Sequence, residues 1–96
     1  MHLNIIKAGR DTILAACDEN ILGKTFKEGK FRIEIKESFY KGEVTDCETF
    51  VEAAKMATII NLVGKEVIEC AIKSRIIDES NIIFIDGIPH AQMVKI

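Results

Sequence analysis

"KFRIEIK", residues 30–36, is the stretch from which the fold of this chain is predicted. Its apolar and charged side chains alternate with a period of two, which is typical of a β-strand. The apolar set is Phe31, Ile33 and Ile35, and the charged set is Arg32, Glu34 and Lys36. Such a strand has one face in water, whereas a central strand between two helical layers is apolar on both faces. We therefore expect an α+β fold, a two-layer α/β sandwich with the helices on one face of a mainly antiparallel or mixed sheet.

The segment before this strand predicts one strand and one helix. Residues 3–7 ("LNIIK") form a short β-branched run that ends at Gly9, which indicates a strand. Over residues 10–21 apolar side chains recur at helical spacing, with Asp11 as a candidate N-cap and Gly23 as a stop.

Two helices are expected after the strand. Thr45 and Glu48 have the spacing of a capping box, in which each side chain bonds the backbone amide of the other residue. The apolar face of residues 49–64 then predicts a helix that ends at Gly64. Residues 65–74 ("KEVIECAIKS") carry an apolar stripe at helical spacing and predict a second helix directly afterwards.

The C-terminal part of the chain predicts a β-hairpin. Residues 81–86 ("NIIFID") and 91–96 ("AQMVKI") are short apolar runs, and residues 87–90 ("GIPH") form a connection of normal hairpin length. The expected order is β-α-β-α-α-β-β in a single domain over residues 1–96, with no internal repeat or linker.

Composition excludes several classes of protein. Apolar residues are 48% and charged residues 29% of the chain, which indicates a globular domain. No apolar run approaches the roughly 20 residues that span a bilayer, and the first residues do not form a signal peptide. We expect a cytoplasmic protein that does not bind a membrane.

The cysteines predict neither a metal site nor a disulfide framework. Cys17, Cys47 and Cys70 are widely spaced, form no C-x-x-C pair and have no histidine near them in sequence. Three is an odd number, and small secreted domains use dense pairing. We expect three buried free thiols, no metal and no other cofactor.

Charge argues against non-specific nucleic-acid binding, because the net charge is −2 and such binding neutralises many phosphates. A local basic group is nevertheless present between residues 24 and 36. It consists of Lys24, Lys27, Lys30, Arg32 and Lys36, with Glu28 and Glu34 interspersed. This group predicts either a solvated face or a patch for an anionic partner.

Three motifs resemble those of a small archaeal family, the domain of unknown function number 424. They are "FYKGE" (39–43), "NLVG" (61–64) followed by "VIECAI" (67–72), and "GIPHAQ" (87–92), in that order. The resemblance covers nearly the whole chain. It implies a two-layer α/β sandwich in an archaeal cytoplasmic protein, and it implies no established activity, cofactor or catalytic residue.

His90 is the first candidate site residue, because an imidazole can act as a base, a ligand or a hydrogen-bond bridge. Asp86 lies four residues earlier across the expected loop, and Gln92 would share a strand face with His90. Asn61 could direct its amide into a pocket beside this hairpin. The four residues could form one polar site, or His90 could only fasten the hairpin and Asn61 only bond the end of a helix.

The stretch Tyr40, Lys41, Gly42 and Glu43 is the second candidate. Gly42 permits a sharp turn or a close approach of the backbone to a ligand, and Tyr40 combines a hydroxyl with an apolar ring. Such a segment is either a tight turn before a helix or a loop that contacts a partner.

These observations favour a small binding module without chemistry of its own, with a protein or ribonucleoprotein partner. The alternative is a small enzyme or ligand-binding protein with a polar pocket around His90. A concave polar pocket would favour the enzyme or ligand-binding protein. A flat, partly apolar surface would favour the binding module.

Overall fold

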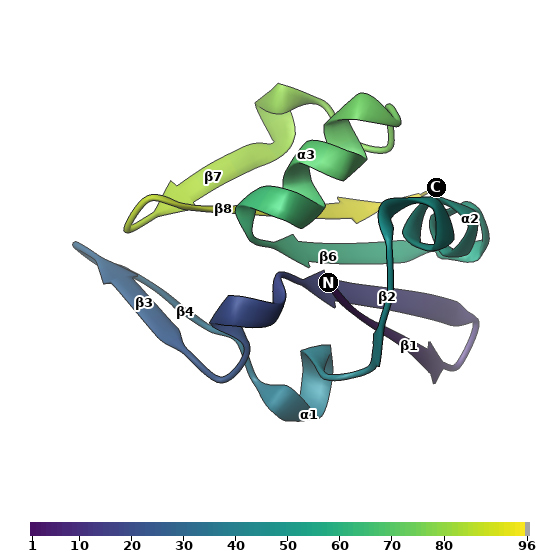
Figure 1. Cartoon of the computed structure of the whole chain (residues 1–96), viewed down its shortest axis with the longest axis horizontal. Helices are drawn as coiled ribbons and strands as arrows, with labels where there is room; N and C mark the ends of the chain where they lie inside the picture. The colour runs from purple at the N-terminus through teal and green to yellow at the C-terminus, as the bar shows by residue number, and fades with distance from the viewer. Residues whose placement is uncertain (96) are drawn as a thin grey trace.

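The computed structural model describes residues 1–95 of the chain. Its main sheet has six strands in the order β5-β1-β2-β6-β8-β7 (Figure 1). These are β1 (His2–Ala8), β2 (Asp11–Cys17), β5 (Glu43–Val44), β6 (Ile59–Val63), β7 (Ile82–Ile85) and β8 (Ile88–Val94). β2 and β6 are parallel, and the other neighbouring pairs are antiparallel. The sheet is therefore mixed and mainly antiparallel, as expected.

Helices α2 (Cys47–Met56) and α3 (Lys65–Lys73) pack together on one face of the sheet (Figure 1). Alternate residues of the central strands point towards them and form the main core. Its largest members include Leu14, Ile60, Leu62, Phe50 and Val67, all fully buried. The predicted arrangement of two long helices on one face is confirmed.

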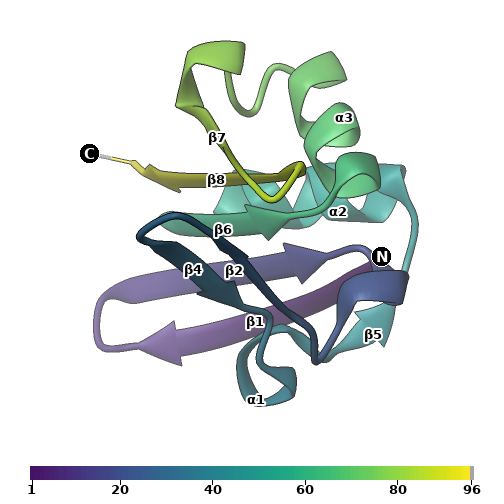
Figure 2. The ribbon, with the colours of Figure 1, turned by 90° about the vertical axis from the view of Figure 1, so that its left-hand side faces the viewer.

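The opposite face carries shorter elements that surround a second core. They are the 3-10 helix η1 (Glu19–Ile21), the ribbon β3 (Thr25–Glu28) and β4 (Phe31–Glu34), and helix α1 (Glu37–Tyr40). Figure 2 shows the ribbon crossing in front of β2. Ile35 and Tyr40 pack there against Cys17 and Val63. Because this face is also covered, the end of β2, residues 14–17, is buried on both sides.

The stretch from which the fold was predicted is a strand, but it lies outside the main sheet. Among residues 1–95, β4 pairs only with β3, in a separate two-stranded sheet. Of its apolar side chains, Ile35 is 0% exposed and Phe31 is 65% exposed. The expectation that Phe31 is buried is therefore wrong, because the ribbon extends beyond the sheet at that end.

The helix predicted over residues 10–21 is also wrong. Residues 11–17 form β2, and a 3-10 turn, η1, follows. The prediction failed because both faces of this strand are buried, so that every residue from Leu14 to Cys17 is apolar. An apolar run of this kind has no period of two and cannot be distinguished from a buried helix by its pattern.

The long helix predicted over residues 49–64 is in fact a helix and a strand. α2 ends at Met56, and Ile59–Val63 form β6. The capping box is replaced by Asp46, whose side chain accepts a hydrogen bond of 2.9 Å from the amide of Thr49. Gly64 precedes α3 instead of terminating the previous helix.

The helix predicted at residue 65 and the C-terminal hairpin are confirmed, with a shorter connection than expected. Residue 96, the end of the last expected strand, lies outside the described residues. Asp86 and Gly87 alone form the turn, both with left-handed φ angles of 53° and 76°. An Asp-Gly pair is favoured in such two-residue turns. Pro89 lies within β8, at the end of β6, where its carbonyl accepts the amide of Gly64 at 2.9 Å.

Candidate functional site

Three of the four residues of the proposed polar site share one face of the sheet. Asn61 of β6 is directly paired with Gln92 of β8, and His90 lies two residues earlier on β8. The Nδ1 atom of His90 is 2.9 Å from the carbonyl oxygen of Leu62. The imidazole therefore hydrogen-bonds within the protein and ties β8 to β6.

Asp86 does not join this group, because it lies in the hairpin turn. Its amide donates a hydrogen bond of 2.7 Å to Glu28 Oε1 at the end of the β3–β4 ribbon. Two surface hollows of about 540 and 520 Å³ lie beside α3, and neither is lined by any of the four residues. The geometry thus places Asp86 apart from His90.

The "FYKGE" segment is packed against β1. A Cβ atom on Gly42 would lie 2.1 Å from the carbonyl oxygen of Leu3, so only glycine allows this approach. Tyr40 is 6% exposed, and its ring meets that of Phe39 edge to face. Asn4 Nδ2 donates a hydrogen bond of 2.8 Å to the carbonyl of Phe39. These contacts show that the segment has a structural role, because it holds α1 against β1.

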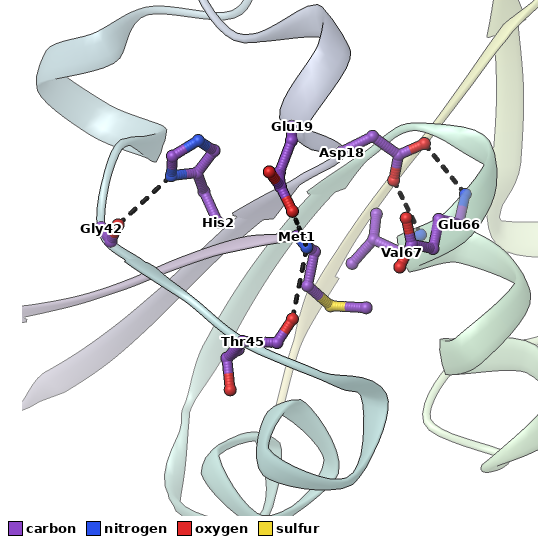
Figure 3. A network of polar contacts seen from close by, with 8 residues as sticks. All are labelled: Met1, His2, Asp18, Glu19, Gly42, Thr45, Glu66 and Val67. Atoms are coloured by element: carbon purple, nitrogen blue, oxygen red, sulfur yellow. Dashed lines mark hydrogen bonds and ion pairs between the residues drawn. The ribbon is translucent and has the colours of Figure 1, made fainter.

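The remaining residues of this segment face solvent or pair with β1. Lys41 and Glu43 are exposed, and Glu43 is paired with Leu3 in the β5–β1 ladder. The carbonyl of Gly42 is 3.2 Å from His2 Nδ1 (Figure 3).

Asp18 is a buried carboxylate that sequence reasoning missed. It lies at the end of β2, and its two oxygens accept the amides of Glu66 and Val67 at 3.0 and 2.9 Å (Figure 3). These amides belong to the first turn of α3, where a negative charge is stabilised. Asp18 is 48 residues from Glu66, so no short-range capping signal could reveal this contact.

The prediction of three free thiols is wrong. Cys47 and Cys70 form a disulfide that joins the start of α2 to α3, with Cα atoms 5.8 Å apart. Their separation of 23 residues contains no pairing signal, and only the packing of the two helices brings them together. Cys17 is free and buried, as expected.

Cys17 and Tyr40 are held in their neutral forms. Burial, aided by the nearby Asp18 charge, raises the pKa of the Cys17 thiol to about 11. Burial, aided by Cys17, raises the pKa of Tyr40 to about 12. A thiolate is the nucleophilic form of cysteine, so Cys17 is unreactive near neutral pH.

The most distinctive exposed feature is an apolar surface at one end of the molecule, which we call the tip surface. It consists of Phe31 at the ribbon end and of Ile83 and Phe84 in β7, whose exposed fractions are 65%, 49% and 63%. Residues 31 and 83–85 line one hollow of about 280 Å³. Ile83 and Phe84 are consecutive strand residues, so their side chains point to opposite faces of β7. Phe84 also borders the hollow of about 540 Å³ between α3 and the hairpin.

The basic group of residues 24–36 lies along the ribbon, where Lys27 and Arg32 are paired on the face opposite to that of Phe31. The ribbon extends away from the sheet, and its turn lies next to the β7–β8 turn (Figures 1 and 2). Lys30 is in the ribbon turn beside Phe31, and Arg32 forms an ion pair of 3.7 Å with Glu34. All five basic side chains are exposed.

Within residues 1–95, no group of three or more histidine, cysteine or acidic side chains has a geometry that could hold a metal ion. Over the same residues, every helix is too short or too polar to cross a membrane.

Fold and surface together define a small mixed α/β domain with an exposed apolar tip. The chain belongs to the family described as "Protein of unknown function (DUF424)", whose model matches residues 7–96. The resemblance inferred from the three motifs is thereby confirmed.

A solved structure has the same fold. It is the crystal structure of an uncharacterized conserved protein from Methanopyrus kandleri, with a TM-score of 0.81 and 27% sequence identity. The match covers 99% of this chain and 92% of that one. A search of curated proteins finds no significant match.

Proposed function

We propose that this domain is a small binding module that docks a macromolecular partner on its tip surface. The observation that carries the proposal is the gathering of Phe31, Ile83 and Phe84, each about half exposed or more, around one hollow. Contiguous apolar patches on soluble domains mark interaction sites, whereas single exposed apolar residues need no explanation.

The alternative, a small enzyme or ligand-binding protein around His90, has weaker support. The ring of His90 forms a hydrogen bond with the carbonyl group of Leu62. Asp86 lies in the hairpin turn, where its backbone amide donates a hydrogen bond to Glu28. A catalytic histidine needs an orienting carboxylate and access to substrate. The neutral thiol of Cys17 supplies no nucleophile near neutral pH.

Cytoplasmic location is part of the proposal. The disulfide between Cys47 and Cys70 does not oppose it, because intracellular proteins of heat-adapted archaea commonly contain disulfides. The family match and the archaeal origin of the similar solved structure support this part of the proposal.

A capture experiment with matched variants tests the function. Tagged protein is incubated with native cell extract, and bound protein and RNA are both identified. We expect the double variant Phe31→Ser/Phe84→Ser to lose the partner that the original chain retains. The control is Met56→Ser, which removes an apolar side chain that is 78% exposed at the end of α2. Equal retention by both variants would refute docking at the tip surface.

His90→Ala distinguishes the two candidate functions. If the tip surface is the docking site, this variant should keep the partner and lose only about 1 kcal/mol of stability, the usual contribution of one hydrogen bond. Loss of the partner together with an unchanged melting curve would favour the alternative site around His90.

A further inference from the structure

We propose that the partner docked on the tip surface is a protein that lays an amphipathic helix into the groove between α3 and the β7–β8 hairpin. This helix carries an acidic residue at one end of its apolar face and a basic residue at the other. The inference rests on the proposed function and names the part of the partner that is recognised. A helix whose apolar face fills an apolar groove is a recurring mode of protein recognition.

The groove is the hollow of about 540 Å³ beside α3, and its apolar lining comes from two sides. Ile68 and Ile72 lie one turn apart on α3 and form one wall. Ile82 and Phe84 are alternate residues of β7, so their side chains share the face that is turned towards α3. Pro89, which is paired with Phe84, completes the lining. The groove is therefore apolar along its length.

The layer of helices on this face of the sheet ends before the edge strand β7. A packed helix occupies about 10 Å and neighbouring strands are about 4.8 Å apart, so α2 and α3 cover about four of the six strands. Phe84 points to the helical face of β7 and is still 63% exposed. A further helix beside α3 would cover this side chain in the way that α2 and α3 cover the central strands.

Two charged residues at the rim of the groove are available to an occupant. Glu69 and Lys73 pair with each other at 3.9 Å. Lys65 and Glu79 also line the groove and are exposed, but neither forms an ion pair within residues 1–95. The occupant therefore meets one positive and one negative charge that it can complement.

These two charges lie at opposite ends of the groove. Lys65 is the first residue of α3, and the preceding amide donates to the carbonyl of Pro89, near the hairpin turn. Glu79 begins the 3-10 helix η2 (Glu79–Asn81), which lies between the end of α3 and the start of β7. The nine residues of α3 span about 13 Å, so the groove accommodates about two turns of a second helix.

A second copy of this chain has no suitable helix within residues 1–95. α2 and α3 bury their apolar faces in the main core through side chains such as Phe50 and Val67. The other helices of this part of the chain have three or four residues, too few for an apolar face of two turns. The occupant is therefore a segment of a different protein.

An added strand at the outer edge of β7 has less support than a helix in the groove. The register leaves the backbone groups of Ile82, Phe84 and Asp86 directed away from β8. Two of these amides are already used, since Ile82 donates to Glu79 and Asp86 donates to Glu28. Only the amide of Phe84 remains for an added strand, which blunts the edge.

Fluorescence anisotropy with labelled, designed peptides of about 14 residues tests the proposal. The acid–base peptide has a stripe of leucines at helical spacing, with a glutamate at one end of the stripe and a lysine at the other. A lactam bridge on its opposite face holds it helical, which reduces the entropy lost on binding. The scrambled peptide has the same composition and bridge without the stripe. We expect the acid–base peptide to bind at least about tenfold more tightly than the scrambled one.

Variants of the groove show where the peptide binds. Phe84→Ser and Ile72→Ser remove apolar lining, and each should weaken binding about tenfold. Phe31→Ser and Met56→Ser change exposed apolar side chains outside the groove and should bind as the original chain does. Because Phe84 is largely exposed, its variant keeps the fold, which thermal melting checks. Unchanged binding by Phe84→Ser would overturn the proposal.

A charge reversal tests the two ends of the groove. The base–base peptide carries lysine at both ends of the leucine stripe. The original chain should bind the acid–base peptide about threefold more tightly, because that peptide complements both charges. Lys65→Glu makes both ends of the groove acidic and should prefer the base–base peptide. The same order of preference in the two proteins would overturn the proposal.

The failures of the two proposals can be told apart. Absence of binding by the acid–base peptide would overturn the helix groove, and docking at the tip surface would then depend on the capture experiment alone. If the peptide binds but the Phe31→Ser/Phe84→Ser variant keeps its captured partner, docking of that partner at the tip surface is refuted. A dimer in light scattering that Phe84→Ser dissociates would overturn the assignment to a different protein.

Discussion

Gly64 and Asp18 illustrate how single residues connect distant parts of this chain. The carboxylate of Asp18, at the end of β2, accepts two amides of the first turn of α3, and Gly64 leaves the space that this carboxylate needs. A Cβ atom on Gly64 would lie 2.4 Å from the Asp18 Cγ atom, and the φ angle of Gly64 is 116°. Both side-chain volume and backbone conformation therefore require glycine at this position.

We expect Gly64→Ala to lower the free energy of unfolding by about 2–4 kcal/mol, through backbone strain and displacement of the Asp18 cap. Gly9→Ala is the matched control, because Gly9 has a φ of 62° but nothing within 4 Å of its added Cβ. It should lose only about 1 kcal/mol. Urea unfolding of both variants measures the difference, and equal losses would contradict the role assigned to Asp18.

The buried Cys17 thiol predicts a loss of stability at alkaline pH. Its pKa is raised from 9.0 to about 11 in the folded state, so the unfolded chain releases this proton first as pH rises. The stabilisation that comes from the protonated, buried thiol is fully present below pH 9 and is lost between pH 9 and 11. Tyr40 adds a similar loss between pH 10 and 12.

Urea unfolding at several pH values between about 8 and 11 measures this effect. Cys17→Ala should be less stable at neutral pH because a buried side chain is shortened, but its stability should fall less steeply above pH 9. Identical slopes for the two proteins would contradict the raised pKa of this thiol.

At the scale of secondary-structure elements, the disulfide fastens α2 to α3. It closes a loop of more than 20 residues that includes β6, and closing such a loop stabilises a fold by about 3 kcal/mol. A hollow of about 220 Å³ lined by both cysteines gives a small reductant access to the bond.

We expect one titratable thiol in denaturant without reductant and three after reduction, with a reduced protein that is about 2–4 kcal/mol less stable. Thiol counting and urea unfolding under both conditions provide the measurement. A count of three thiols without reductant would show that the bond does not form.

Apolar side chains on the same face of the ribbon strand should contribute unequally to the free energy of unfolding. Ile35 is fully buried in the second core, whereas Phe31 is 65% exposed at the ribbon end. Ile35→Ala should therefore cost about 2–4 kcal/mol of unfolding free energy, and Phe31→Ala well under about 1 kcal/mol. Similar losses in urea melts would mean that the ribbon packs differently from the description above.

At the scale of the whole molecule, stability should be concentrated in the two central strands. β2 and β6 have strand neighbours on both sides and cores on both faces, whereas the β3–β4 ribbon forms a separate two-stranded sheet. Native-state hydrogen exchange should be slowest for amides of β2 and β6 and fastest around the ribbon turn. Equal protection of the ribbon and β2 would contradict this hierarchy.

The elements predicted correctly from sequence are those with local signals. α3 has an apolar stripe at helical spacing, and β7 and β8 are short apolar runs joined by a turn. The C-terminal hairpin followed from such patterns. The arrangement of two helices on one face was inferred from the alternation in residues 30–36, although that strand lies outside the main sheet. The three motifs also identified the family, because each is a short continuous stretch.

The candidate site was much harder to predict, because few local sequence signals indicate it. Sequence placed His90, Gln92 and Asn61 near one another, and strand pairing does bring them to one face. It gave no indication that Phe31 and Phe84 line the same hollow, because a separate ribbon brings Phe31 to the edge of β7. The basic group, which lies within thirteen residues, was visible from the start.

The sequence by itself determined the elements with a clear period, the turn residues, the family and the charge distribution, because each depends on residues close together in the chain. The tertiary structure alone decided that residues 10–21 and 59–63 contain strands, that Cys47 bonds Cys70, and that Asp18 caps α3. Burial on both faces removes the alternation by which a strand is recognised. The other two contacts join residues more than 20 positions apart, and no local pattern encodes which distant partners the packed core brings together.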